Sequence, residues 1–600
     1  MAQVVTTDST KIYQLQKWLG LNESPDGDTG LKLGEAAVMR NFRVTRENHL
    51  QIRPGYAPVC TPAEDSPVRL WSGYVGGAFH FLCACGGHLW DLGGRAGLEP
   101  APTEDWGKTD LGEIEDAETF FFGFAQKVYL LTGQEYYCWD GAGDVKVVEG
   151  YVPIVTTAAP PAGGGTLLER VNVLTGKKRA VYAPDGTSAV FHLPETGIDE
   201  VIGVTGTDLS WTADLAAGTV TFAAPPAKGV NTVTITWRKG SGSREKVTAM
   251  RWAEFYNGAT DARVFLYGDG TNETVYSDLD ENGQPTAEYF PDLNVMAVDT
   301  ANTPIPAMIR HYDRLLVFKS DGAYTAQYDS MKLETGAVTA AFYATPLNRE
   351  IGCVAPGQAR LVRNYPRTLF GRSVYTWALA SGATRDERNA KRISDRVENT
   401  LASFDLASCV TFDDEQRQEY YVLCGDRAVI HNYGNDAWYC YDHFPARRMA
   451  CVDGELYFGT EDGRLMHVSR RYRNDDLAPI DAYWESGSLD FDRDWKRKYS
   501  TEIWVSLKPE SQGRVTVTAQ SNRRSEYVKK EAAAGLSTLT NADFAHWSFR
   551  TNRKPQVQRV RLKVRRFTFY KLILSSCSAS ATATVLAADF RVRYAGKVRS

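Results

Sequence analysis

One stretch, residues 311–328, constrains the fold of this chain more than any other. It contains an apolar run at 315–318, then the pair Asp321-Gly322, then Tyr324 on the far side of that pair. An Asp-Gly pair supplies the positive φ that a tight turn needs, so the pattern predicts a β-hairpin. An isolated hairpin is marginally stable in water, because nothing covers its apolar face. The hairpin therefore requires further strands to pack against.

The same plan recurs along the chain, in most copies with an aromatic residue near one end. Turn signals separate the paired strands, as at Gly86-Gly87 and Asp462-Gly463. The further copies lie at residues 79–90, 128–139, 264–276, 368–377, 420–431 and 456–467. Repeated hairpins without a helical period are typical of a β-propeller. We expect an all-β chain with a propeller of about six or seven blades, since the copies are unevenly spaced.

Changes in composition divide the rest of the chain. Residues 156–165 form a Pro/Gly/Ala linker, and the residues after it are poor in aromatics and rich in Thr, Val and Gly. Short alternating strands there, and again near the C-terminus, predict two β-sandwiches. The predicted parts are an N-terminal lead-in at 1–65, a first part of the propeller at 66–153, an inserted β-sandwich at 166–238, a second part of the propeller at 247–470 and a basic C-terminal β-sandwich at 479–600.

The lead-in offers a strand that could close the propeller ring. Residues 41–46 and 50–56 are interpreted as paired strands around Glu47-Asn48, and residues 35–40 predict one or two helical turns. An N-terminal strand that returns to complete the last blade is one way in which propellers close.

Charge is unevenly distributed over the 600 residues. Residues 495–600 hold 22 Lys/Arg and 6 Asp/Glu, while the remainder holds 46 Lys/Arg and 67 Asp/Glu. A basic module on an acidic body indicates either an acidic partner or subunits joined head to side. A solvated face is the alternative, and sequence-specific binding of nucleic acid is disfavoured because no aromatic-interleaved groove accompanies the basic residues.

The ten cysteines lie mostly within apolar strand patterns and make no CxxC pair. Such usage is typical of free thiols in a reducing compartment rather than of a disulfide framework or a zinc site. The N-terminus lacks the pattern of a signal peptide, and no run approaches the roughly 20 apolar residues of a membrane span. We expect a protein made and folded in the cytosol, without a membrane segment.

Sequence motifs for catalysis are missing. HExxH, G-x-S-x-G, dinucleotide and phosphate-loop patterns are all absent, so we expect no enzyme, no catalytic residue and no cofactor. One stretch matches the start of a calcium loop, with oxygen ligands at Asp278, Asp280 and Asn282. Its twelfth position is Tyr289, where a bidentate Glu is required, so an ordinary acidic turn is the better interpretation.

Several segments carry a family resemblance. They are residues 20–22, 34–46 and 52–56 near the N-terminus, 276–277, 288–291 and 311–318 in the centre, 174–178, 185–186, 218–222 and 224–226 in the insert, and 484–485 and 497–498 near the C-terminus. The first and central groups resemble head–tail stabilisation proteins of tailed phages. The insert is similar to small β modules of phage structural proteins.

The resemblance implies a structural virion protein that forms the tail nozzle of a short-tailed phage. Such a subunit would assemble with itself into an oligomeric ring, usually a hexamer, below the head–tail adaptor or portal protein and beside other tail proteins. The ring would give a channel for genome retention and DNA ejection, through which DNA passes without sequence recognition. Assembly would take place in the host cytoplasm.

Two other functions fit the same residues. A propeller can also be a glycan-binding protein or a polysaccharide-degrading enzyme, which would need paired carboxylates facing a pocket. A soluble binding propeller with no role in a virion is the third. Ring assembly would distinguish the nozzle from both, because a propeller alone does not imply a function.

Overall fold

A computed structural model of the chain describes residues 10–23, 30–93, 106–257, 263–332, 338–378, 389–510, 512–522, 524–535 and 554–597. The predicted all-β fold, a propeller with two β-sandwiches, is confirmed. Helical structure in the described residues is confined to α1 (Glu245–Thr248), α2 (Glu398–Ala402) and 3-10 residues at Asn389 and Asp395–Val397. None of these helices is long and apolar enough to cross a membrane.

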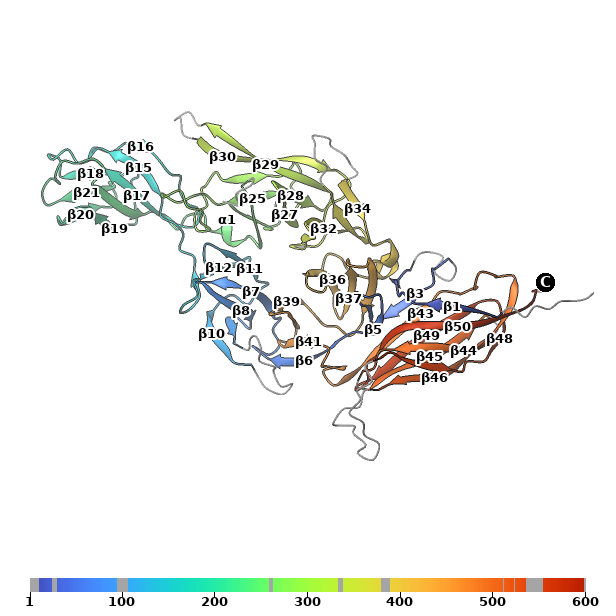
Figure 1. The fold of residues 1–600 in the computed structure, drawn as a ribbon. Coiled ribbons are helices and arrows are strands. Elements are labelled where there is room, and N and C mark those ends of the chain that lie inside the picture. The colour runs from blue at the N-terminus through green and yellow to red at the C-terminus, as the bar shows by residue number, and fades with distance from the viewer. Residues whose placement is uncertain are drawn as a thin grey trace, which may run out of the picture.

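In the part of the chain that the structure describes, seven blades of four strands each form the propeller, which lies at the centre of Figure 1. The first three blades are β7 (Arg69–Val75), β8 (Ala78–Cys85), β9 (His88–Leu92) and β10 (Lys108–Glu113); β11 (Phe120–Phe124), β12 (Lys127–Leu131), β13 (Tyr136–Trp139) and β14 (Lys146–Val147); and β23 (Trp252–Phe255), β24 (Val264–Tyr267), β25 (Glu273–Tyr276) and β26 (Val295–Ala297). The next three are β27 (Ala307–His311), β28 (Arg314–Lys319), β29 (Gly322–Lys332) and β30 (Val338–Asn348); β31 (Arg360–Val362), β32 (Tyr365–Phe370), β33 (Ser373–Trp377) and β34 (Ala390–Arg392); and β35 (Val410–Asp414), β36 (Glu419–Cys424), β37 (Arg427–Asn432) and β38 (Ala437–Tyr441).

The seventh blade takes its strands from both ends of the propeller sequence. It contains β39 (Arg448–Val452), β40 (Glu455–Gly459) and β41 (Leu465–Ser469), and its outermost strand is β6 (Gly55–Cys60) from the lead-in. The turn between β40 and β41 needs a glycine at position 463. Its φ is +90°, and a Cβ there would lie 1.7 Å from the carbonyl oxygen of Ala63. The first strand of each blade contacts that of the next, and β39 contacts β7, so the ring is closed.

The inserted sandwich projects from the ring between the second and third blades (Figure 1). Its larger sheet has the order β16-β15-β17-β22-β19 and its smaller sheet β18-β21-β20. The strands are β15 (Ile154–Ala159), β16 (Thr166–Leu167), β17 (Lys177–Tyr182), β18 (Val190–His192), β19 (Glu200–Thr205), β20 (Trp211–Asp214), β21 (Thr219–Phe222) and β22 (Val233–Arg238). Tyr182, Phe191 and Trp237 pack in a core that belongs to this unit alone.

The C-terminal sandwich lies on the other side of the ring and contains most of the lead-in (Figure 1). One sheet has the order β4-β5-β50-β44-β47, with β1 beside β50 and β48 beside β44, and the other runs β46-β45-β49-β43-β3. The strands are β1 (Thr10–Leu15), β3 (Glu35–Arg40), β4 (Phe42–Val44), β5 (Leu50–Ile52), β43 (Ala478–Ser486), β44 (Lys496–Leu507), β45 (Gly513–Ser521), β46 (Arg524–Ala534), β47 (Gln556–Val560), β48 (Val564–Phe567), β49 (Tyr570–Ser578) and β50 (Thr584–Lys597). Two short strands, β2 (Gly20–Leu21) and β42 (Asn474–Asp475), connect it to the propeller.

The helical turns predicted for residues 35–40 are wrong. This segment is strand β3, which pairs antiparallel with β43 and meets β38 at Arg40. Ala36 and Met39 are buried, whereas Val38 is exposed. Backbone pairing with strands 400 or more residues away overrides the local helical preference of Glu, Ala and Met.

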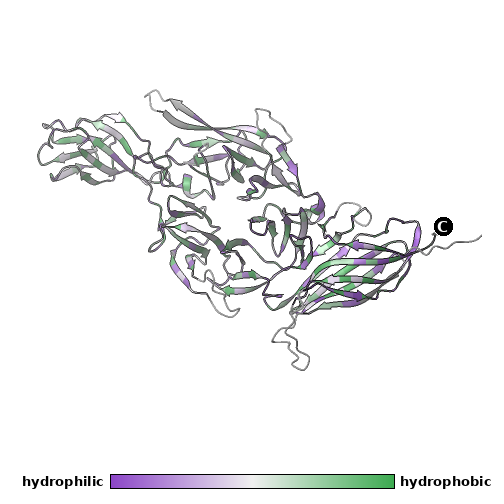
Figure 2. Cartoon of the chain, in the orientation of Figure 1, coloured by the Kyte–Doolittle hydropathy of each residue, from purple (hydrophilic) through white to green (hydrophobic). Residues whose placement is uncertain are grey.

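Hydrophobic residues follow the strands of the blades and of both sandwiches, with hydrophilic residues between them (Figure 2). The largest core is continuous from the lead-in through the later blades into the C-terminal sandwich; it includes Trp18, Trp377 and Trp484. The lead-in therefore shares one hydrophobic core with the propeller and with the C-terminal sandwich.

Candidate functional site

A basic face covers one sheet of the C-terminal sandwich. We define it by Arg559, Arg561, Lys563, Arg565, Arg591 and Arg593, all of which are exposed. The hydrophobic residues between them along 559–565 are buried, so basic and apolar side chains alternate between the two sides of this segment. Arg565 and Arg593 both pair in register with Tyr499 of the central strand, from opposite sides.

Glu502 is an acidic residue within the basic face. It is buried, and its carboxylate accepts hydrogen bonds from Arg591 Nη1 at 2.8 Å and Arg559 Nε at 2.6 Å. The hydrogen bond from Arg591, then that from Arg559, lowers the pKa of Glu502. Asp589 lies on the same face of β50 as Arg591 and Arg593, so two carboxylates stand against six cations and the face stays positive.

A second group of charged residues joins the lead-in to the propeller. Arg53 has no exposed side-chain surface and binds both carboxylate oxygens of Asp475, at 2.8 and 2.5 Å. The same guanidinium donates to the side-chain oxygen of Asn41 and to the carbonyl oxygen of Asp442. A buried bidentate pair of this kind fixes geometry in both partners. Arg53 thus joins the lead-in, the last two blades and the start of the C-terminal sandwich.

Arg43, ten residues before Arg53, makes a parallel connection to the sixth blade. Its Nη2 lies 3.2 Å from Glu419, whose side chain is fully buried. Glu419 also accepts hydrogen bonds from the hydroxyls of Tyr421 and Tyr439, both at 2.6 Å. The carboxylate is fully satisfied, as a buried charge must be.

No sequence motif predicts a role for either arginine. Arg53 lies in the Arg-Pro-Gly of residues 53–55, and Arg43 interrupts the apolar pattern of β4. For Arg43, a charged residue between two apolar residues of a strand was the available signal, since such residues are seldom fully buried without a partner.

At the centre of the propeller, a cavity of about 250 Å³ lies where the inner strands begin. Arg69, Glu118 and Arg448 line it, and Glu118 lies within ion-pair distance of both arginines. Glu254 lies on the inner strand β23. Desolvation raises its pKa to about 7, against the opposing effect of Arg360. The centre of the propeller is therefore charged, but the described residues show no pair of acids arranged around a nucleophile.

The residues of the proposed calcium loop are occupied by protein contacts. Asp278 pairs with Arg263 at 2.9 Å and accepts a hydrogen bond from Asn294. Asp280 accepts hydrogen bonds from the backbone N–H groups of Asn282 and Gln284, which closes its own turn. Among the described residues, no group of three or more His, Cys, Asp or Glu side chains is placed to hold a metal ion.

Comparison with known proteins identifies no family for the chain. No protein-family model matches the sequence, and no curated protein matches it. Among solved structures, the designed protein Ika8 is similar over 69% of this chain and 99% of its own, at 8% identity and a TM-score of 0.32. An exo-β-1,3-galactanase from Phanerochaete chrysosporium is similar over 56% and 95%, at 6% identity and a TM-score of 0.19. The extracellular domain of a hybrid two-component system from B. thetaiotaomicron is similar over 87% and 80%, at 7% identity and a TM-score of 0.21. Likeness at this level assigns no function.

Proposed function

We propose that the protein is a structural subunit of the tail nozzle of a short-tailed phage. Copies of it assemble into a ring, a hexamer by the family resemblance, below the head–tail adaptor or portal protein. The ring encloses a channel in which DNA is retained and then ejected. The observation that carries this proposal is the basic face on a chain whose other parts are acidic.

The charge distribution supports contact between subunits through the basic face. Complementary charges on two parts of one molecule favour head-to-side association, which closes into a ring when the rotation permits. A sheet face with alternating exposed cations and buried apolar residues presents charge without breaking its own core. The same face would meet acidic surface on the adaptor or on another tail protein.

The rigid connection between the sandwich and the propeller also supports a structural role. Arg53 and Arg43 hold the lead-in against the later blades through buried ion pairs. A hydrophobic core shared by the propeller and the C-terminal sandwich keeps the two in a fixed arrangement. A subunit that encloses a channel needs such a fixed arrangement. The proposal places passing DNA in the channel of the ring, where contact with it needs no base-specific groups.

Native mass spectrometry of the full chain, with negative-stain images of the same sample, tests the proposal. We expect a closed ring that dissociates as salt is raised, since screening weakens exposed charge pairs. A second sample contains the adaptor of the same virus, to test for a ring that assembles only with the adaptor as its template. A chain that stays monomeric with and without adaptor, and that binds or cleaves a polysaccharide, would overturn the proposal.

Charge reversal tests the face itself. We expect Arg561→Glu with Arg593→Glu to abolish ring formation, because both side chains are exposed and neither is a partner of Glu502. The matched control is Lys246→Glu with Arg372→Glu, which changes the net charge equally at exposed positions on the propeller. Loss of assembly in both variants alike would show that net charge, rather than the basic face, governs association.

A further inference from the structure

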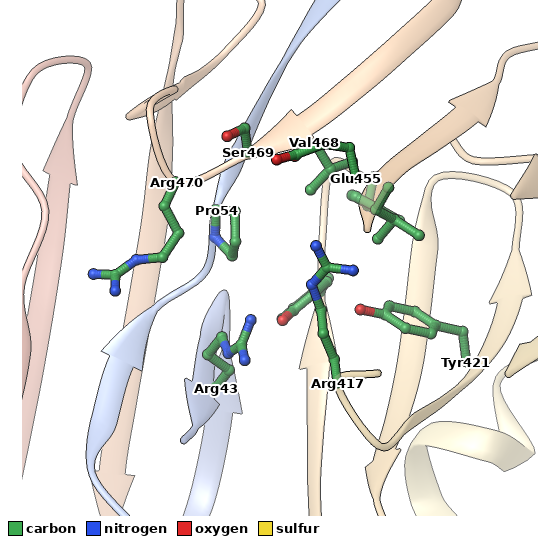
Figure 3. A pocket seen from close by; sticks show the side chains of 11 residues that line it. Arg43, Pro54, Arg417, Tyr421, Glu455, Val468, Ser469 and Arg470 are labelled. Atoms are coloured by element: carbon green, nitrogen blue, oxygen red, sulfur yellow. The ribbon is translucent and has the colours of Figure 1, made fainter. Parts of the chain in front are cut away.

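A cavity of about 290 Å³ lies between the lead-in and the last two blades. Arg43 of β4 lines it on the side of the C-terminal sandwich, and Tyr441, Arg417 and Leu456 line it on the side of the propeller. Figure 3 shows Arg43 and Arg417 on opposite walls, with both guanidinium groups directed into the space. The volume is at the lower end of that found for pockets binding small molecules.

Two buried polar atoms lining this cavity have no hydrogen-bond partner among the described residues. They are the hydroxyl oxygen of Tyr441, a residue 3% exposed, and Nε of Arg43, whose side chain is 16% exposed. Leaving such groups unsatisfied costs free energy, so native proteins rarely do so without a ligand, a water or a functional reason. Their presence on residues that line one cavity indicates a missing partner.

The acids near the cavity are already engaged. Glu419 is satisfied by two tyrosine hydroxyls and Arg43, and Asp414 pairs with Arg417 at 2.7 Å. Glu455 lies 2.9 Å from Nε2 of His467. The groups left without partners are therefore N–H and O–H donors. Burial raises the pKa of Tyr441, so its hydroxyl keeps the proton that it would donate.

We propose that this cavity binds a small oxyanion, a phosphate or a carboxylate, between Arg43 and Tyr441. Its oxygens would accept hydrogen bonds from Arg43 Nε and from the Tyr441 hydroxyl, beside the positive charge of Arg417. Phe444, Leu456 and Val468 supply apolar walls that limit the ligand to a compact group. Because the two sides of the cavity belong to different bodies, the bound anion ties the C-terminal sandwich to the propeller.

Two tyrosines of the same strand provide the matched test. Tyr439 and Tyr441 are both buried in β38, but the hydroxyl of Tyr439 donates to Glu419 whereas that of Tyr441 has no partner. Removal of the Tyr441 hydroxyl should leave the ligand-free protein equally or more heat-stable. Removal of the Tyr439 hydroxyl should lower the melting temperature, because it takes a donor from a buried carboxylate.

The experiment is calorimetric titration of the full-length protein with sodium phosphate and, separately, with sodium malonate at constant ionic strength. We expect saturable one-to-one binding of at least one anion, with a rise in melting temperature. Phosphate without malonate binding identifies a phosphate site, and the reverse identifies a carboxylate site. Tyr441→Phe should weaken the binding about tenfold, the loss of one hydrogen bond to a charged group, whereas Tyr439→Phe should leave it unchanged.

Three results would overturn the inference. The first is the absence of saturable heat with either anion at millimolar concentration. The second is equal affinity in Tyr441→Phe and the wild type, which would place any bound anion elsewhere. The third is a fall in the melting temperature of ligand-free Tyr441→Phe as large as that of Tyr439→Phe, which would show that the hydroxyl already has a partner.

Discussion

The two β-sandwiches are attached to the propeller in opposite ways. The inserted sandwich leaves and re-enters the ring between two blades and keeps a core of its own around Trp237. The C-terminal sandwich shares its core with the later blades, and Trp484 belongs to the same cluster as Trp377 of the fifth blade. One module is therefore an appendage of the ring, and the other is a part of it.

The ion pairs that join the two sandwiches to the propeller differ in the same way. Arg179 of the insert reaches Glu281 of the propeller at 2.9 Å, in a pair whose side chains are 23% and 38% exposed. Arg53 binds Asp475 in a pair that is almost completely buried. Exposed pairs contribute little to stability, whereas removal of one partner from a buried pair is costly. The comparison predicts independent unfolding of the insert and joint unfolding of propeller and C-terminal sandwich.

The largest expected effect comes from truncating one tryptophan in each sandwich. Trp237→Ala and Trp484→Ala each remove a fully buried indole, and each should destabilise its own cooperative unit by about 3–5 kcal/mol. In scanning calorimetry, Trp237→Ala should shift a small separate transition. Trp484→Ala should shift the main transition of the propeller and C-terminal sandwich together. A single transition that moves equally in both variants would contradict the division.

A smaller effect is expected from breaking the buried pair at the junction. Arg53→Met keeps apolar volume but leaves the Asp475 carboxylate without its cation, which should lower the free energy of unfolding by roughly 3 kcal/mol. The double variant Arg53→Met with Asp475→Leu removes both charges and should recover most of the loss. Chemical denaturation of the main transition measures the free energy of unfolding of the single and the double variant. No recovery in the double variant would show that the other hydrogen bonds of Arg53 account for most of the lost stability.

The pH dependence of the propeller's stability provides a third test. Glu254 has a pKa of about 7 in the folded chain, above the value of an unfolded glutamate, because burial disfavours its charge. The stability that the protonated Glu254 side chain contributes is fully present below the pKa of an unfolded glutamate. It is lost as the pH rises through 7. Glu254→Gln should therefore be more stable than the wild type at pH 8, with a smaller difference at pH 5. The transition of the insert should show no such difference between the two proteins.

The smallest effect is expected at the contact between the insert and the ring. Glu281→Gln removes the charge that faces Arg179, and the free energy of unfolding should change by less than about 1 kcal/mol. Hydrogen exchange of strands β15 and β17 measures any loosening of the insert. A change comparable to that of Arg53→Met would show that the insert is attached as firmly as the C-terminal sandwich.

Much of this fold was accessible from local sequence signals. Gly86, Gly87 and Gly463 all have positive φ in the turns where they were expected, and the apolar runs beside such turns form the middle strands of the blades. Hairpin turns are encoded by adjacent residues, so a single sequence reveals them.

Long-range pairing could not be predicted in the same way. Residues 35–40 carry good helix formers, yet the partners that make them a strand lie at 478–486. The partners in the Arg43–Glu419 and Arg53–Asp475 pairs could not be predicted, since the two members of each pair are separated by most of the chain. The cavity beside Arg43 could not be predicted either, because its walls come from several segments that lie far apart in the sequence.

The pairing of β6 with β41 sets an order of events during synthesis. Gly55 emerges from the ribosome long before Ser469, with which it pairs, and β1 must wait longer still for β50. Until then, the ring has an open seam and the basic face has an incomplete sheet beneath it. An unfinished polypeptide consequently lacks the surface through which we expect subunits to associate, so that a ring would admit completed subunits and leave nascent ones out.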